Sequence, residues 1–311
     1  MITPLLRCLK EDGYHVTVNI TPNPKKVLNN NPYIDEFMIH GGEKEVPNKD
    51  LKEHWEKISK GYDKFINLSG SIEENLLKPE GGRAYTWDKE TRHKHCNRNY
   101  YDETLKIGGY GHIKGRNGEL YFTKLEEKLA RDYRRKHKGK FLILWSLSGS
   151  SFHKIYPFSD AVASLILDKY PDVMIMTVGD ALCEMLEWRY ERSKCYSGKW
   201  PIRKSMIMTK YVDLVIGTET GILNAAGCFN TPEIVLLSHS SEENLCKYWE
   251  NCIALHADVE CYPCHRLHYT LKSCPLDSVL GTPVCMSKLK ARVVLDSIEE
   301  FYIRWKNRND K

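Results

Sequence analysis

The second half of this 311-residue sequence alternates short, continuously apolar segments with segments of helical periodicity. The apolar segments are KFLILWSL (140–147), DVMIMTVG (172–179), VDLVIG (212–217) and PEIVLLS (232–238), and helical patterns lie near 158–170, 180–190 and 202–210. Strands this uniformly apolar are buried on both faces, which is typical of a parallel sheet covered by helices. We therefore predict an α/β fold for this half.

The first half shows a weaker form of the same alternation. The segment TPLLRCLKED (3–12) predicts a helix that ends at Gly13, and strands are predicted at YHVTVNI (14–20) and YDKFINL (62–68). A basic helix ending in RRKHKGK (134–140) closes this series. The series and the chain length predict two domains, residues 1–138 and 139–311. Helical spacing of apolar residues from Ala291 to Trp305 predicts a long helix at the end of the second domain.

Composition restricts the compartment and the partners. No segment approaches the roughly 20 apolar residues of a membrane span, and the first residues do not resemble a signal peptide. Eleven cysteines in a chain of this length favour reduced thiols or a metal site over a disulfide framework. The net charge of +5 is mild, and we interpret its basic clusters as solvated surface. We predict a cytoplasmic protein with at most peripheral contact at the inner face of a membrane and no nucleic-acid partner.

The turn GTETG (217–221) joins a buried strand to a helix of small residues. Ligands of open parallel sheets bind beyond the carboxyl ends of the strands. Glycine allows close approach of a ligand, Thr218 and Thr220 offer hydroxyl groups, and the N-terminus of the helix favours an anion. A diphosphate suits this turn, although an ordinary strand-to-helix connection has the same pattern.

A second loop with anion-binding residues follows the strand at 140–147. It contains Ser148, Ser150 and Ser151 as hydrogen-bond donors and Lys154 as a compact positive charge. An exposed loop lysine is usually only solvated. Two such loops at strand ends in the same half nevertheless favour one shared anionic ligand.

Together these segments resemble glycosyltransferase family 9, the bacterial heptosyltransferases that use ADP-heptose. GSSFHKIYP (149–157) is similar to the family's Gly-Ser/Thr loop and Lys-x-Trp-Pro, with Tyr156 in place of the tryptophan. ETGILNAAG (219–227) is similar to its diphosphate turn, with Glu219 for an aspartate and Asn224 for a histidine. VGDALCE (178–184) is similar to the segment whose acidic residue holds the ribose.

The resemblance implies a GT-B fold, in which two Rossmann-like domains with parallel sheets face each other across a cleft. It implies that the first domain binds the acceptor and the second binds the nucleotide-sugar donor. Lys154 would contact the donor phosphate, Thr220 and Gly221 would cradle the diphosphate, Glu184 would bind the ribose, and Gly179 would allow close approach. The implied donor-binding set is Ser148, Ser150, Ser151, Lys154, Gly179, Glu184, Thr218, Glu219, Thr220, Gly221 and Asn224.

The implied reaction transfers a sugar, heptose in this family, from a nucleoside diphosphate to a glycan or lipopolysaccharide core with inversion. Such enzymes neutralise the diphosphate with helix N-termini and cations, so no cofactor is expected for transfer. A protein hydroxyl acceptor and a binding protein with impaired catalysis are the alternatives, and a zinc-finger nucleic-acid binder is a weaker one.

Four cysteines form a separate pattern. Cys261 and Cys264 form a Cys-x-x-Cys pair, and Cys274 and Cys285 follow. Four thiolates suit zinc or iron, so we predict a structural metal, with buried thiols as the alternative. The segment is also similar to the iron-binding finger of autotransporter heptosyltransferases.

No catalytic residue is assigned from the sequence. The chain begins inside the first predicted helix, whereas family members carry before it a strand and a Gly-Asp loop with the expected catalytic base. The expected base therefore lies upstream of Met1. The sequence predicts either a shortened reading of a longer protein or a nucleotide-sugar-binding remnant.

Overall fold

The computed structural model describes residues 1–39, 46–68, 86–266 and 274–309, which form two compact units. The first unit comprises Met1–Tyr121, Glu243–Tyr248 and Cys264–Leu267. The second comprises Phe122–Glu242, Trp249–Pro263 and His268–Lys311. Among the described residues, no helix combines the length and the apolar composition needed to cross a bilayer.

The first unit is built around a small parallel sheet. Strand β1 (Thr17–Ile20) pairs with β2 (Glu36–Ile39) in parallel, with Thr17 opposite Glu36. The helices of this unit are α1 (Thr3–Glu11), α2 (Pro22–Leu28), η1 (Asn48–Asp50), α3 (Leu51–Ser59), α4 (Lys89–Cys96) and α5 (Tyr100–Ile107). Leu5 of α1 and Leu105 of α5 are buried in a core that includes Val18 of β1.

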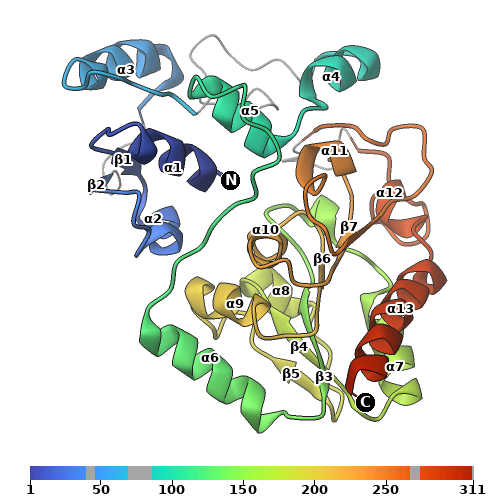
Figure 1. Ribbon diagram of the computed structural model, residues 1–311. Coiled ribbons are helices and arrows are strands. Elements are labelled where there is room, and N and C mark those ends of the chain that lie inside the picture. The colour runs from blue at the N-terminus through green and yellow to red at the C-terminus, as the bar shows by residue number, and fades with distance from the viewer. Residues whose placement is uncertain (40–45, 69–85, 267–273, 310–311) are drawn as a thin grey trace. The chain divides into compact units, whose positions relative to one another are not determined.

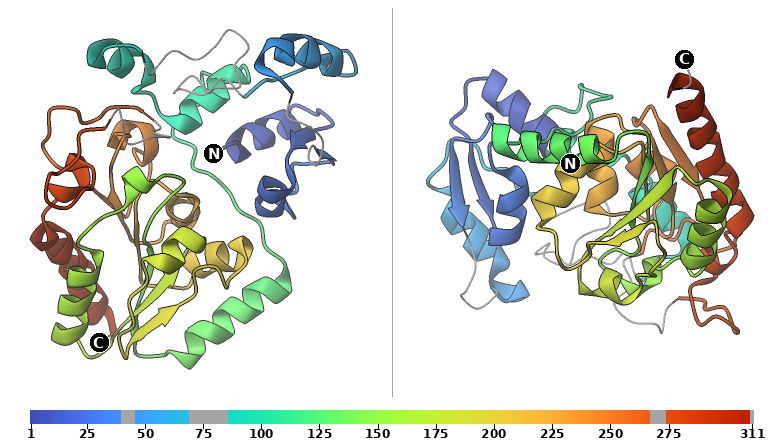
Figure 2. Two further views of the ribbon diagram at one scale, coloured as in Figure 1. Left: turned by 180° about the vertical axis from the view of Figure 1, so that it is seen from behind. Right: turned by 90° about the horizontal axis from the view of Figure 1, so that it is seen from below.

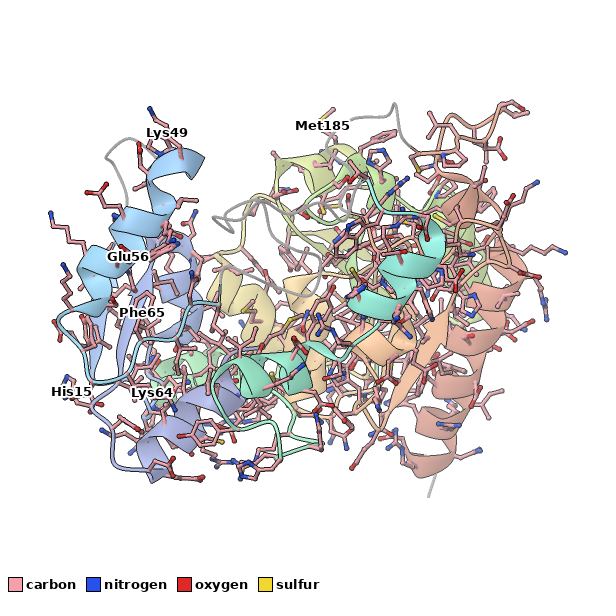
Figure 3. All side chains as sticks on the ribbon, turned by 90° about the horizontal axis from the view of Figure 1, so that it is seen from above. His15, Lys49, Glu56, Lys64, Phe65 and Met185 are labelled. Carbon is pink, nitrogen blue, oxygen red and sulfur yellow. The ribbon has the colours of Figure 1, made fainter. Side chains whose placement is uncertain are left out.

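One predicted strand of the first unit is wrong. Residues 62–68 have no strand conformation, although Ile66 and Leu68 pack on the core. The Nζ of Lys64, labelled in Figure 3 next to Phe65, lies 4.9 Å from the ring centroid of Tyr110. Side-chain contacts therefore hold this segment against the core of the first unit. Strand β1 pairs instead with β2, which was not predicted from the sequence.

The second unit contains a six-stranded parallel sheet. Its strands are β3 (Phe141–Ser146), β4 (Val173–Val178), β5 (Ser193–Cys195), β6 (Leu214–Gly217), β7 (Glu233–Leu236) and β8 (Cys252–Leu255), in the order β5-β4-β3-β6-β7-β8. All five neighbouring pairs are parallel. The four strands predicted in this half correspond to β3, β4, β6 and β7, so the predicted α/β fold is confirmed.

Helices cover both faces of this sheet. The helices are α6 (Lys124–Lys136), η2 (Phe152–Lys154), α7 (Ser159–Lys169), α8 (Ala181–Met185), α9 (Ile202–Thr209), α10 (Gly221–Cys228), α11 (Glu242–Leu245), α12 (Val284–Ser287) and α13 (Ala291–Asn309). Helices α7 and α13 lie on one side of the sheet, and α9 and α10 lie on the other (Figures 1 and 2). The core joins Phe141 and Ile143 of β3 to Ile298 and Trp305 of α13. The long terminal helix was thus predicted correctly.

The strand order reverses at β3, and this determines where a ligand can bind. Ser146 at the end of β3 pairs with Val178 of β4 on one side and with Gly217 of β6 on the other. The loops that follow these three strands therefore leave the sheet side by side. In open α/β sheets, this reversal point forms a crevice at the carboxyl ends of the strands.

The boundary between the compact units differs from the one predicted at residues 138 and 139. The second unit begins at Phe122 and includes α6, which the sequence assigned to the first domain. Arg203 of α9 donates two hydrogen bonds to Glu126 of α6, from Nε over 2.6 Å and from Nη2 over 2.8 Å. Helix α6 therefore packs on the second sheet's helices, which sequence order alone does not reveal.

Candidate functional site

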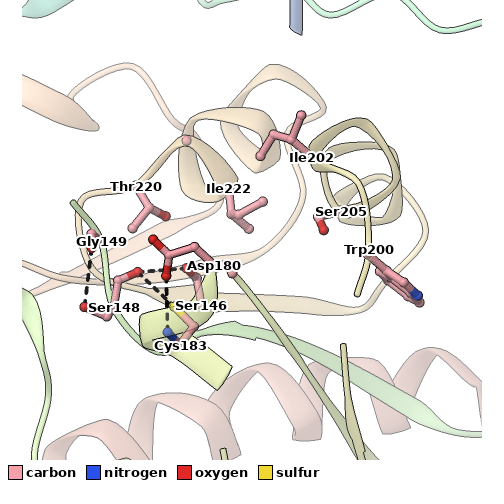
Figure 4. Close-up of a pocket in the computed structure, with 12 residues that line it drawn as sticks. Ser146, Ser148, Gly149, Asp180, Cys183, Trp200, Ile202, Ser205, Thr220 and Ile222 are labelled. Carbon is pink, nitrogen blue, oxygen red and sulfur yellow. Dashed lines mark hydrogen bonds between the residues drawn. The ribbon is translucent and has the colours of Figure 1, made fainter. Parts of the chain in front are cut away.

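A cavity of about 300 Å³ lies at the carboxyl ends of β3, β4 and β6 (Figure 4). It is lined by Ser146, Ser148, Gly149, Gly179, Asp180, Cys183, Trp200, Ile202, Ser205, Thr220, Gly221 and Ile222. All of these residues belong to the second unit. The volume is at the small end of the range for ligand-binding pockets, and the position is the reversal point of the strand order.

The structure brings together only part of the predicted donor-binding set. Ser148, Gly179, Thr220 and Gly221 line the cavity. The residues that do not line it are Ser150, Ser151, Lys154, Glu184, Thr218, Glu219 and Asn224. The predicted set therefore divides into four residues that line the cavity and seven that do not.

The N-terminus of α10 faces the cavity and has no side-chain cap. Thr220 is the N-cap residue, with φ −134° and ψ 166°, and its side chain makes no capping hydrogen bond. Its Oγ1 is buried and has no hydrogen-bond partner in the described part of the chain. Helix N-termini carry unsatisfied N–H groups and a positive dipole end. These groups are suited to bind an anion at Thr220 and Gly221.

Gly217 brings this turn close to β3. A Cβ at this position would lie 2.9 Å from the backbone oxygen of Ser146 and 2.8 Å from Leu223 Cδ2. No other residue fits there without displacing the backbone. The glycine that ends β6 thus sets the spacing of the two loops that the sequence singled out.

Lys154 connects these two loops from behind the cavity. Its side chain is buried, and its Nζ donates a hydrogen bond of 2.9 Å to the backbone oxygen of Glu219. Gly149 lies between them, since a Cβ there would be 2.8 Å from Lys154 Cδ and 3.2 Å from Thr220 Cγ2. In this structure, Lys154 therefore supports the wall that Gly149 and Thr220 present to the cavity.

Glu219 is a buried carboxylate that holds the loop after β7. Its Oε1 accepts hydrogen bonds from the backbone N–H groups of Ser238 over 2.7 Å, His239 over 3.0 Å and Ser240 over 3.2 Å. Its Oε2 accepts one from the Ser238 hydroxyl over 2.7 Å. Burial alone would raise the pKa of Glu219, but His239, Lys154 and the Ser238 hydrogen bond outweigh it and lower the pKa. Glu219 therefore has a supporting position and makes no contact with the cavity.

Two further predicted residues lie near this turn. Asn224 donates from Nδ2 to the Thr220 backbone oxygen over 2.9 Å, and its Oδ1 has no hydrogen-bond partner among the described residues. Thr218 is buried directly before Glu219, and its Oγ1 likewise has no described hydrogen-bond partner. Both residues therefore help to shape the turn instead of lining the cavity.

The loop after β4 contributes a carboxylate that the sequence did not single out. Asp180 is exposed and lines the cavity, and its Oδ1 caps α8 by accepting from Leu182 N over 3.0 Å. Glu184 lies one turn later, and its Oε2 would be 2.8 Å from a Cβ on Gly198. The helix predicted over 180–190 is only Ala181–Met185. Glu184 faces the loop that contains Gly198.

Gly179 lines the cavity in a backbone conformation that residues with a side chain rarely adopt. Its φ is +152°, and a Cβ there would lie 2.3 Å from Cys183 Sγ. Cys183 also lines the cavity, and burial raises the pKa of its thiol. The glycine thus allows α8 to lie directly against the loop that leaves β4.

The opposite end of the cavity holds the aromatic side chain of the lining. Figure 4 shows Trp200, Ser205 and Ile202 away from Gly149 and Thr220. Trp200 stacks on Tyr196 with a ring separation of 3.9 Å, and the Lys204 Nζ lies 4.5 Å from its ring centroid. Tyr196 and Lys204 thus cover the two faces of the indole, and the ring closes this end of the cavity, while the helix N-terminus at the other end suits phosphate.

The four cysteines do not form a metal-binding group. No cluster of three or more His, Cys, Asp or Glu side chains that could hold a metal occurs among residues 1–39, 46–68, 86–266 and 274–309. Cys264 belongs to the first unit, whereas Cys261, Cys274 and Cys285 belong to the second. Four cysteine thiolates are chemically suited to bind zinc, but the structure does not bring these four side chains together at one site.

Comparison with known proteins gives a match in structure and none in sequence. No family model matches the chain, and no curated protein matches it. A glycosyl transferase family 9 structure from Veillonella parvula matches 97% of this chain and 92% of its own, with 15% identity and a TM-score of 0.66.

Two further structures agree over most of the chain. The E. coli ADP-heptose lipopolysaccharide heptosyltransferase II matches 98% of this chain and 95% of its own, with 13% identity and a TM-score of 0.60. The iron-containing dodecameric glycosyltransferase TibC from enterotoxigenic E. coli matches 96% of this chain and 71% of its own, with 10% identity and a TM-score of 0.56. The chain therefore has the GT-B type fold of glycosyltransferase family 9, as its sequence motifs predicted.

Proposed function

We propose that this chain is a glycosyltransferase of the family 9 type that binds a nucleoside-diphosphate sugar in the cavity of its second unit. The observation that carries the proposal is the uncapped N-terminus of α10 at the cavity, where Thr220 keeps a buried hydroxyl without a described partner. An anion is the ligand that these groups favour. The shared fold supports the assignment to transferases but does not identify the substrate.

The proposed chemistry is transfer with inversion at the anomeric carbon. An acceptor hydroxyl attacks while the nucleoside diphosphate leaves, so negative charge grows on the phosphate oxygens. In this proposal the N–H groups at Thr220 and Gly221 stabilise that charge. We assign no catalytic base.

We further propose ADP as the nucleotide and heptose as the sugar. The support is the sequence resemblance and the fold shared with an E. coli enzyme named for ADP-heptose and lipopolysaccharide. Trp200 and Asp180 both line the cavity, so we propose that the base lies against the Trp200 ring and that Asp180, the one carboxylate among the lining residues, binds the ribose. Asp180 thereby replaces Glu184 as the proposed ribose ligand.

The acceptor that we propose is a glycan or a lipopolysaccharide core, with a protein hydroxyl as the alternative. A second candidate function is binding of nucleotide-sugar with impaired transfer, because the one carboxylate among the cavity-lining residues, Asp180, caps α8 with its Oδ1. A cytoplasmic location is proposed from the cysteine-rich composition, which is typical of reducing compartments.

Transfer is proposed to need no cofactor, and a structural zinc or iron at the four cysteines stays a prediction. Elemental analysis of protein purified without chelator tests the metal. About one metal ion per chain would support it, whereas no zinc or iron and four titratable thiols would contradict it.

A donor screen tests the function. The chain is incubated with ADP-, UDP- and GDP-sugars, and release of the nucleoside diphosphate is measured with and without glycan acceptors. Acceptor-dependent release from an ADP-sugar would support the transferase. Binding of ADP without release from any donor would favour the second candidate, and absence of both would contradict the proposal.

A further inference from the structure

Helix α6 carries two adjacent rows of side chains on its outer surface. Leu125 and Leu129 lie four residues apart and are 64% and 58% exposed. Spacing of three and four residues places side chains on one helix face. A neighbouring row with that spacing consists of Lys124, Lys128, Arg131 and Arg135, all of which are exposed. The helix therefore presents an apolar row beside a cationic row.

Two of the three acidic side chains of α6 are bound by cations outside this row, and the third pairs with one member of the row. Glu126 is bound by Arg203, which holds its pKa at about 2. Glu127 accepts a hydrogen bond of 2.9 Å from Lys210. Asp132 forms an ion pair with Arg135. Two of the three carboxylates are thus turned toward cations of α9 and its C-terminal end, and the outer surface keeps a net positive charge.

The inner surface of α6 is fixed to the second unit. Ala130 is buried, and the Tyr133 hydroxyl is 3.0 Å from the Tyr196 hydroxyl. Arg134 pairs with Asp213 over 2.9 Å. Figure 1 shows α6 beside α9. Since these contacts hold the helix in one orientation, the leucine and lysine rows face outward as a fixed surface.

We propose that this surface of α6 docks on an anionic lipid bilayer. A helix that places leucines beside a row of lysine and arginine residues is suited to the interface between headgroups and acyl chains. The cations are attracted to anionic lipids, while the leucines enter the acyl boundary. A second copy is disfavoured because two cationic rows repel, and a nucleic-acid backbone offers nothing to the leucines.

The inference does not depend on the proposed transferase activity. Its test uses no nucleotide and no acceptor. The full chain is mixed with sucrose-loaded vesicles of phosphatidylcholine alone, or of phosphatidylcholine with phosphatidylglycerol, and the bound fraction is measured after sedimentation. Two variants are compared with the wild type: Leu125→Gln with Leu129→Gln, and Lys124→Gln with Lys128→Gln.

A matched control keeps the result specific. Leu165→Gln with Ile303→Gln changes two apolar side chains that are each 51% exposed on other helices of the second unit. We expect the wild type and this control to bind anionic vesicles at least tenfold more strongly than neutral ones, and less strongly in high salt. The lysine variant is expected to lose about tenfold or more, and the leucine variant about fivefold or more.

Three results would overturn the inference. Equal binding to neutral and anionic vesicles would remove the role of the cations. If both α6 variants bound vesicles as strongly as the wild type, the membrane contact would be made by another surface of the protein. Concentration-dependent self-association of the wild type, lost in the leucine variant while vesicle binding is absent, would assign the surface to a second copy. Circular dichroism of each variant confirms that it is folded.

Discussion

The Lys154 ammonium donates a hydrogen bond to the backbone carbonyl oxygen of Glu219 over 2.9 Å. Lys154 follows β3 and Glu219 follows β6, so this bond joins the two loops that the sequence singled out separately. The Glu219 carboxylate in turn holds the backbone of residues 238–240. Two buried charged side chains, Lys154 and Glu219, therefore support the loops at the ends of β3 and β6. Thr220 and Gly221 of these loops line the cavity.

The first prediction concerns Lys154. Removal of its charge by Lys154→Met leaves Glu219 buried with less compensation, so the free energy of unfolding is expected to fall by about 3 kcal/mol. Urea denaturation measures this change. The control is Lys169→Met, which breaks an exposed ion pair with Glu299 and is expected to cost about 1 kcal/mol or less. Equal effects of the two substitutions would show that Lys154 has no special role.

The second prediction concerns pH. The folded pKa of Glu219 lies below its ordinary value of 4.5, so its ionised form stabilises the fold above that pH. This contribution is lost as the pH falls through the folded pKa. We expect Glu219→Gln to be destabilising at about pH 7 and less so at about pH 4, relative to wild type. An exposed control, Glu191→Gln, should show no such difference, and a larger Glu219→Gln effect at about pH 4 would contradict the account.

The third prediction concerns the attachment of α6. The hydrogen bonds from Arg203 lower the pKa of Glu126 to about 2, so their stabilising effect is present above the ordinary value of 4.5 and is lost toward pH 2. Arg203→Ala is expected to raise the pKa of Glu126 and to lower the free energy of unfolding by about 2 kcal/mol at neutral pH. Carboxyl titration by NMR measures the pKa. An unchanged Glu126 pKa would mean that α6 is not held by this pair.

The fourth prediction concerns Trp200. If the base lies against its ring, ADP should quench tryptophan fluorescence, and Trp200→Ala should weaken ADP binding by about 1–3 kcal/mol. Trp200→Phe should keep most of the affinity. Trp305→Phe, in the core against Phe141, serves as the control. Quenching that persists in Trp200→Ala would place the base elsewhere.

The central strands were predictable because their apolar runs are continuous. β3, β4, β6 and β7 are buried along their whole length. The two strands of this sheet that the sequence did not predict, β5 and β8, are its edges and have three and four residues. Edge strands pair on one side only, so they leave a weaker apolar pattern. Their position depends on the partner strand more than on their own residues.

The site was predictable in place but only partly in detail. The carboxyl ends of the predicted strands, together with the family resemblance, indicated Ser148, Gly179, Thr220 and Gly221 without a structure. The directions in which the side chains of Lys154 and Glu219 point were not predictable, because each side chain is oriented by a hydrogen-bond partner in another loop. Asp180 and Trp200 were missed for a related reason, since only the folded sheet brings their loops to one cavity. An aspartate directly before a helix was the one available signal for Asp180.

The most direct test of the account is a calorimetric titration of ADP into the full chain and into Gly221→Leu. Gly221 lines the cavity, and a Cβ there meets only Met206 Cε at 3.4 Å, so the fold is expected to accept a larger side chain that fills the site. The account predicts that one ADP binds the wild type and that Gly221→Leu, with unchanged thermal stability, binds at least tenfold more weakly. Equal ADP affinity in the two proteins, or no ADP binding by the wild type, would contradict it.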